Sequence, residues 1–172
     1  MGRLVPRLIC FDSCPFISMV KPSEANHDEA RSAMSACFAE IEAGRMVAVA
    51  STIIFAELLD KSYDAMRSRF DNRRGHLVEV NEEIAMRARV IRDTIRPHAG
   101  GKCLDLPDCI YIATAGAYDC EALVTVDGLS HDPTVPNLKH RLLTAAPMIE
   151  KRFGVKVRTP MEIVGQGLLP LE

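Results

Sequence analysis

The sequence predicts an α/β protein in which helices wrap a central parallel β-sheet. The first observation is that five short apolar runs have the length and composition of buried strands. They occupy residues 8–11, 46–50, 77–80, 122–126 and 155–157. The second observation is that segments with apolar residues at helical spacing separate most of these runs. Because consecutive parallel strands are usually joined by a helix that packs on the sheet, this alternation indicates an α/β sandwich.

The first predicted helix lies between the first two strands. Ser23 is a suitable N-terminal cap, and Gly44 is suited to ending the helix because glycine adopts positive φ without steric cost. The apolar residues between them recur at three- and four-residue spacing, as Ala30, Met34, Cys37, Phe38 and Ile41. This stripe should face the sheet.

Two helices flank the third strand. Thr52 can cap a helix that runs without a break through residues 53–70, and Asn81 can cap the next one. The helix after Asn81 carries apolar residues at helical spacing, at Ile84, Ala88, Ile91 and Ile95. Pro97 should end it, because proline lacks the backbone N–H that a helix needs.

The last predicted helix begins near Leu106 and Pro107 and continues through the sequence CIYIATAGAYD. It is apolar on nearly every face, which is typical of a buried helix. The segment over residues 128–154 contains three prolines and shows no clear periodicity. We predict a connection there, with a short helix near residues 140–145.

The chain length suits a single domain. A chain of 172 residues can bury a core without disulfides or a structural metal. The sequence contains no internal repeat, low-complexity tract or Pro/Ser-rich linker. We therefore expect one domain over residues 1–172.

Composition favours a cytoplasmic protein. No apolar run approaches the ~20 residues needed to cross a bilayer. The apolar segment near the N-terminus is interrupted by Asp12 and no small-residue cleavage site follows it, which is a poor signal-peptide pattern. None of the six cysteines forms a Cys-x-x-Cys pair, and most have apolar neighbours. We expect reduced thiols that act as small hydrophobic residues.

The formal net charge of −2 does not by itself indicate nucleic-acid binding. One stretch, residues 67–75, is locally basic and carries Arg67, Arg69, Arg73 and Arg74. It is either a phosphate-binding rim, in which Arg73 and Arg74 contact the substrate, or a solvated helix end.

Acidic residues follow the predicted strands. Asp12 follows the first strand, Asp127 follows the fourth, and Glu57 lies in the first turns of the helix after the second. In an open parallel sheet, ligands bind beyond the C-terminal ends of the strands. Glu57 stands among apolar neighbours, where a carboxylate is costly to desolvate unless a partner such as a divalent cation compensates it.

Asp108 opens the apolar helix, and the topology alone does not place it near the other acids. Each acid also has a structural interpretation. Asp12 and Asp127 suit turns at strand ends, and Asp105 with Asp108 forms the spacing of a capping box at a helix start. Taken singly, these structural interpretations are at least as good as a functional one.

Four segments together resemble the PIN-domain family: ICFDSCPFI with Asp12, STIIFAELL with Glu57, LPDCIYIATA with Asp108 and LVTVDGLS with Asp127. The closing GVKVRTPMEI is similar to the last strand of that family and the turn after it. The resemblance spans nearly the whole chain in the right order. It implies a three-layer α/β/α sandwich with a central parallel sheet of about five strands, in which Asp108 joins the other three acids.

The resemblance also implies an activity and partners. It predicts an endoribonuclease dependent on Mg²⁺ or Mn²⁺, in which Asp12, Glu57, Asp108 and Asp127 are both catalytic residues and metal ligands. Carboxylate oxygens are the ligands that these hard cations prefer. Many bacterial members resembling this chain are VapC-type toxins, which implies a small antitoxin protein and a homodimer. The long connection over residues 128–154 departs from the compact toxins.

Two rival functions remain open. Phosphatases of the haloacid dehalogenase type resemble the opening strand, but they carry Asp-x-Asp where this chain has Asp12, Ser13 and Cys14. A non-catalytic PIN-like module that binds RNA or a protein is the other alternative. Four clustered carboxylates argue against it, because they repel phosphate unless a metal is bound.

Overall fold

A five-stranded parallel sheet forms the centre of the protein. The computed structural model describes residues 5–20, 28–70, 75–96, 104–128 and 142–165. The strands are β1 (Arg7–Phe11), β2 (Met46–Ser51), β3 (Gly75–Val78), β4 (Ala122–Val124) and β5 (Val157–Arg158). They lie in the order β3-β2-β1-β4-β5, and every neighbouring pair is parallel. The predicted α/β fold with about five parallel strands is confirmed, and strand boundaries differ from the prediction by about two residues.

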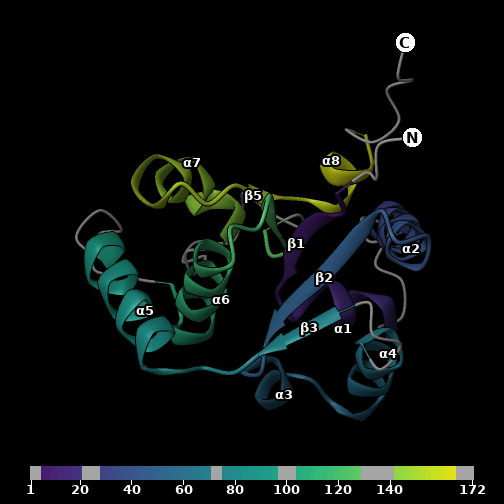
Figure 1. Ribbon diagram of the computed structural model, residues 1–172, viewed down its shortest axis with the longest axis horizontal. Helices are drawn as coiled ribbons and strands as arrows, with labels where there is room; N and C mark the ends of the chain where they lie inside the picture. Colours follow the sequence, from purple (N-terminus) through teal and green to yellow (C-terminus); the bar gives the residue numbers. More distant parts are fainter. Residues whose placement is uncertain (1–4, 21–27, 71–74, 97–103, 129–141, 166–172) are drawn as a thin grey trace, which may run out of the picture.

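Helices cover both faces of this sheet (Figure 1). On one face α6 (Leu106–Ala117) packs against the central strands, and α5 (Glu82–Ile95) packs against α6. The other face is covered by α1 (Cys14–Val20), α2 (Asp28–Glu42) and α4 (Asp60–Phe70). Two further helices, α7 (Leu142–Phe153) and α8 (Pro160–Gly165), contact β5 and α2 respectively. The architecture is therefore the predicted three-layer sandwich.

The helices α2 and α5 form as their periodicity predicts. The buried residues of α2 are the five of the predicted stripe, and Gly44 follows the helix with φ of 73°. Asn81 caps α5, since its side chain accepts a hydrogen bond of 3.0 Å from the backbone N–H of Ile84. Ser23, the predicted cap of α2, lies outside the described residues.

The helix predicted over residues 53–70 is wrong, because it is two helices. The first, α3 (Ile54–Glu57), ends after one turn, and Leu58 is extended with ψ of 133°. Thr52 is not a cap either, because no side chain caps this turn. The second helix, α4, begins at Asp60 and buries Met66 and Phe70.

Two helices were not predicted from the sequence, and a third is longer than predicted. Helix α1 begins directly after Asp12 and Ser13, and α8 is only six residues long. Helix α7 replaces the short helix predicted near residues 140–145, and it continues through Pro147. A helix is therefore present where a short one was predicted, but it is longer, and the prediction of a connection is wrong for residues 146–153. Residues 129–141 lie outside the described part.

Four phenylalanines fill the core on the side of α1, α2 and α4. The fully buried ring of Phe16 lies 6.0 Å from Phe11, 6.0 Å from Phe38 and 6.3 Å from Phe70, measured between ring centroids. Five of the six cysteines lie in the described residues, and all five are free thiols. Within the same residues, no helix is long and apolar enough to cross a membrane.

Candidate active site

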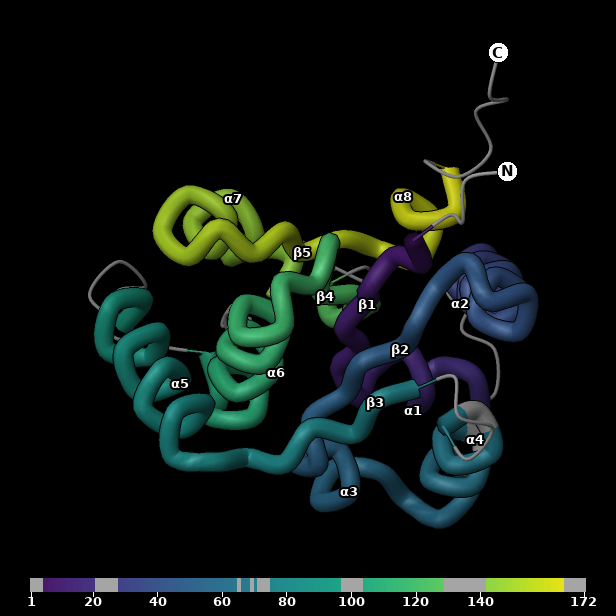
Figure 2. Tube along the Cα trace, viewed as in Figure 1, coloured from purple at the N-terminus to yellow at the C-terminus, as the bar shows by residue number. Residues whose placement is uncertain are grey.

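Asp12 is a carboxylate in the interior of the protein. Its side chain is only 2% exposed, because it follows β1 directly and its backbone N–H donates to Val124 O of β4 (3.2 Å). The N–H of Cys14 donates to Asp12 Oδ1 (3.1 Å), and the buried hydroxyl of Thr125 is a second hydrogen-bond partner. The β1–β4 pairing, visible in Figure 2, therefore places Asp12 beside the end of β4.

Asp127 follows β4 and has structural partners of its own. Its N–H donates to Thr125 Oγ1 (2.9 Å), so the same threonine contacts both Asp12 and Asp127. Its Oδ2 accepts a hydrogen bond of 3.1 Å from the N–H of Leu142, the first residue of α7. Asp127 thus stabilises the start of α7, a helix that is longer than the one predicted near residues 140–145.

Glu57 is held in place by a hydrogen bond from Tyr111, a residue that was not predicted to belong to the site. The hydroxyl of Tyr111 donates to Glu57 Oε2, and Ser13 is a second partner of that hydroxyl. Burial, followed by the hydrogen bond to Glu57, raises the pKa of Tyr111 far above its ordinary value, so the hydroxyl keeps its proton. In sequence, Tyr111 reads as one more apolar residue of α6; its position three residues after Asp108 was the available signal.

Asp108 combines a structural role with an electrostatic one. It forms the predicted capping box with Asp105, whose N–H donates to Asp108 Oδ2 (3.2 Å). Burial, with repulsion from Asp127, raises the pKa of Asp108 to about 7. The structural interpretation of Asp108 is therefore confirmed, and its functional interpretation stays a prediction.

The four predicted acids share one electrostatic environment. Burial raises the pKa of Asp12 well above its ordinary value, and repulsion from Asp108, Asp127 and Glu57 adds to that effect. They do not form a closed set of ligands: the described residues contain no group of three or more His, Cys, Asp or Glu side chains placed to hold a metal ion. The metal-binding carboxylate cluster that the family resemblance implies is therefore not formed as a ligand group in the described residues.

The chemistry of the acids nevertheless fits a hard divalent cation. One oxygen of each carboxylate accepts a hydrogen bond from a protein donor, which orients the group. Buried carboxylates that repel one another are costly to ionise, and a cation would remove that cost. Oxygen donors suit Mg²⁺ or Mn²⁺. The neighbouring Cys14 does not offer a thiolate ligand, because burial and the four acids raise the pKa of its thiol far above the ordinary value.

The predicted basic rim is only partly described. Arg73 and Arg74 lie outside the described residues, and Arg67 is exposed on α4. A substrate contact by Arg73 and Arg74 therefore stays a prediction.

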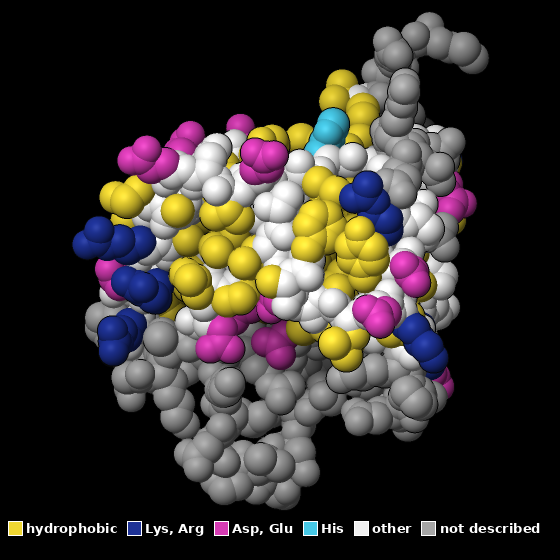
Figure 3. All heavy atoms as spheres, turned by 90° about the horizontal axis from the view of Figure 1, so that it is seen from below, with side chains coloured by type: hydrophobic (Ala, Val, Ile, Leu, Met, Phe, Trp, Pro, Cys, Tyr) yellow, Lys and Arg dark blue, Asp and Glu magenta, His cyan; other side chains and the backbone are white. Residues whose placement is uncertain are grey.

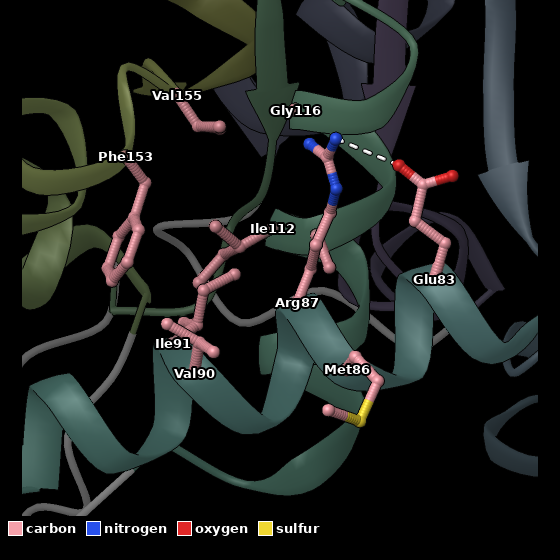
Figure 4. A pocket seen from close by; sticks show the side chains of 10 residues that line it. Glu83, Met86, Arg87, Val90, Ile91, Ile112, Gly116, Phe153 and Val155 are labelled. Atoms are coloured by element: carbon pink, nitrogen blue, oxygen red, sulfur yellow. Dashed lines mark hydrogen bonds and ion pairs between the residues drawn. The ribbon is translucent and has the colours of Figure 1, made fainter.

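A separate apolar cavity of about 340 Å³ lies between α5, α6 and the segment after α7 (Figure 4). Its walls include Met86, Ile112 and Phe153, and an ion pair between Glu83 and Arg87 (2.9 Å) stands at its edge. None of the four acids lines it. The charged residues in its lining, Glu83 and Arg87, are paired with each other and the other lining residues are apolar, so we place the candidate active site at the acids.

Without metal, the protein should become more stable as the pH is lowered from about 8 to about 5. The folded-state pKa of Asp108 is about 7, above the unfolded value of ~3.9, so the folded protein binds a proton that the unfolded chain lacks. The free energy of unfolding should therefore rise by up to ~1.4 kcal/mol for each pH unit lost in this window. Urea denaturation in EDTA at several pH values measures the slope.

Asp108→Asn should flatten this dependence and raise stability at neutral pH, because the amide cannot ionise while its oxygen can still accept from Asp105. Asp60→Asn, an exposed acid in the first turn of α4, is the control and should leave the slope unchanged. If Asp108→Asn instead lowers stability by ~1 kcal/mol, Asp108 acts only as a helix-start carboxylate.

Comparison with known proteins agrees with this fold. The family model described as PIN domain matches residues 9–128. The structure of VapBC2 from Rickettsia felis bound to a DNA fragment from their promoter is similar, with a TM-score of 0.51 and 12% identity over 88% of this chain and 98% of that chain. A toxin–antitoxin complex from Klebsiella pneumoniae has a TM-score of 0.41 and 21% identity, over 68% of this chain and 84% of that chain. No curated protein matches the sequence.

Proposed function

This chain belongs to the PIN-domain family, and from that premise we propose that it is a metal-dependent endoribonuclease that hydrolyses RNA phosphodiester bonds. The observation that carries the proposal is the position of Asp12. It is a nearly fully buried carboxylate just beyond the C-terminal end of the central strand β1, and its pKa is raised by burial and by three further acids. Burying a carboxylate costs free energy of folding, and carboxylates with such perturbed pKa values are concentrated at binding and catalytic sites.

The four acids would have different roles in the site, according to their positions. Asp12, Asp108 and Asp127 would hold Mg²⁺ or Mn²⁺ directly or through water, and Glu57 would complete the site or orient the attacking water. When bound, the cation supplies positive charge against the phosphate and lowers the pKa of water. The chain's own contribution is orientation: Thr125 holds Asp12 and Asp127, while Tyr111 holds Glu57.

We further propose that the chain is the toxin of a toxin–antitoxin pair, inhibited by a small antitoxin protein and active as a homodimer. The fold similarity to VapBC2 supports this role. The whole chain, residues 1–172, would act as one nuclease domain, because β5, beyond the matched region, pairs with β4 and completes the sheet.

The purified protein should cleave a mixed RNA pool with Mg²⁺ or Mn²⁺ and lose all cleavage in EDTA. Added zinc should not be needed, because the acids supply only oxygen ligands. Gel electrophoresis of the RNA after incubation measures this. Full cleavage in EDTA contradicts the mechanism, and RNA binding without cleavage under every metal condition supports the rival binding module.

Mn²⁺ should also raise the melting temperature of the protein. A ligand that binds only the folded state stabilises it by about 2.7 kcal/mol at roughly a hundred times Kd, which corresponds to several degrees for a chain of this size. Asp108→Asn should reduce this shift, whereas Asp60→Asn should preserve it. A wild-type melting temperature that does not respond to millimolar Mn²⁺ shows that the acids form no competent metal site.

A further inference from the structure

An exposed apolar surface lies where α3 ends and α4 begins. We define the α3–α4 ledge as Phe55, Leu59 and Tyr63. Leu59 is 81% exposed, and the two aromatic side chains are each 36% exposed. The rings contact one another, with centroids 5.7 Å apart and planes tilted by 58°. Isolated apolar residues on a surface need no explanation, but two partly exposed rings held together beside an exposed leucine form a contact surface.

The ledge lies next to the candidate active site along the chain. Phe55 is two residues before Glu57 in α3, and Glu57 is bound to Tyr111 beside Asp12. Figure 3, which views the molecule from the side of α3, shows hydrophobic side chains close to acidic ones on this face. The ledge and the candidate active site thus share the short helix α3, and a polynucleotide long enough to pass around this helix would reach both.

A positive charge continues this surface along α4. Arg67 is exposed one helical turn after Tyr63, the spacing at which side chains on one helix face are neighbours. Along the chain, Phe55 precedes Glu57, and Leu59, Tyr63 and Arg67 follow it, with the exposed acids Asp60 and Asp64 between them. Two of these features suit a polynucleotide: the site acids would hold a phosphate through the bound cation, and flat bases can stack on the rings.

We propose that the α3–α4 ledge is a base-stacking platform for single-stranded RNA, a proposal that rests on the nuclease function proposed above. Aromatic side chains stack on bases of any sequence, because every base has a π face. Those faces are accessible in unpaired RNA and are covered by neighbouring bases in a duplex. The site therefore selects unpaired nucleotides next to the bond that is cut.

The test replaces each ring by a leucine, which keeps most of the apolar area and removes the stacking face. All variants are made in an Asp12→Asn background, so that the RNA is not consumed. Affinity for a fluorescent single-stranded RNA of about ten nucleotides is measured by anisotropy with Mg²⁺ present. Phe55→Leu and Tyr63→Leu should each weaken binding at least about fivefold, which is the lower value for one stacked base.

Matched variants separate stacking from other effects. Phe55→Tyr and Tyr63→Phe keep the rings and should bind like the parent. Tyr118→Leu removes a tyrosine that is 45% exposed just after α6, at the other end of that helix from Asp108, and should also leave binding unchanged. The same RNA annealed to its complement should bind the parent more weakly than the single strand does.

Each outcome decides the proposal. If the leucine variants bind RNA as tightly as the parent, the base-stacking proposal is wrong and the ledge is better explained as a protein-docking surface. Equal affinity of the parent for the duplex and the single strand leads to the same conclusion. If the wild-type protein neither binds nor cleaves RNA, the nuclease function itself fails and the ledge fails with it. If wild type binds and cleaves while the leucine variants bind normally, only the ledge fails.

Discussion

Asp12→Asn should reduce the rate of RNA cleavage on the order of a hundredfold or more while the fold survives. An amide oxygen is a poorer ligand for a hard cation than a carboxylate oxygen. The amide can still accept the hydrogen bond from Cys14, and it removes a buried charge that three other acids repel. The variant should therefore melt at or above the wild-type temperature in EDTA. Initial rates on a labelled RNA, with circular dichroism as the check of folding, measure both effects.

Asp119→Asn is the matched control for this experiment. It makes the same chemical change at an exposed residue beyond the opposite end of α6 from Asp108. Its φ of 48° is one that asparagine tolerates as well as aspartate. Cleavage should stay at the wild-type rate. A folded Asp12→Asn protein that cleaves as fast as wild type removes Asp12 from the site.

Phe16→Ala should lower the free energy of unfolding by about 3–5 kcal/mol. Phe16 is fully buried in α1 and contacts phenylalanines from β1, α2 and α4, so the truncation leaves a cavity that several elements line. Against a typical stability of ~5–15 kcal/mol, this is a large loss. Denaturant titration followed by circular dichroism measures it.

The control is Phe55→Ala, a truncation of the same size at a partly exposed ring with one aromatic partner. It should cost less than about 1.5 kcal/mol. A loss below ~1 kcal/mol for Phe16→Ala would show that α1 adds little to the core. Because α1 starts immediately after Asp12 and Ser13, its packing also fixes the direction in which the chain leaves the site.

Periodicity predicted the helices whose environment is simple. In α2 and α5 one face is buried and the other is solvated, so apolar spacing and caps were sufficient. The break between α3 and α4 at Leu58 cannot be seen in the spacing of the apolar residues. Ile54, Leu58, Ser62, Met66 and Phe70 follow one another at four-residue spacing, as one continuous helix would have them. The backbone turn there depends on tertiary packing, which periodicity does not record.

The candidate site likewise has residues whose positions the sequence predicts and residues whose positions it does not. Strand ends predicted the places of Asp12 and Asp127, because parallel strands end at one edge. The proximity of Asp108 came from the family resemblance, since its helix is reached through a connection whose path the sequence does not determine. Tyr111 was missed because a buried tyrosine and a buried aliphatic residue give the same pattern. The hydrogen bond that distinguishes them depends on α3 and α6 meeting in space.

The pairing of β1 with β4 has a consequence for synthesis on the ribosome. Arg7 and Glu121, near the start of this pairing, are 114 residues apart in the chain and are joined by a hydrogen bond of 2.6 Å from Arg7 Nε to Glu121 Oε2. A contact between such distant segments closes a long loop and therefore forms slowly. Asp12 meets Thr125 and Asp127 only after that closure, so a nascent chain that has not yet exposed β4 lacks the site. Under the endoribonuclease function proposed above, the chain would not cleave its own messenger RNA until β4 and Asp127 have left the ribosome.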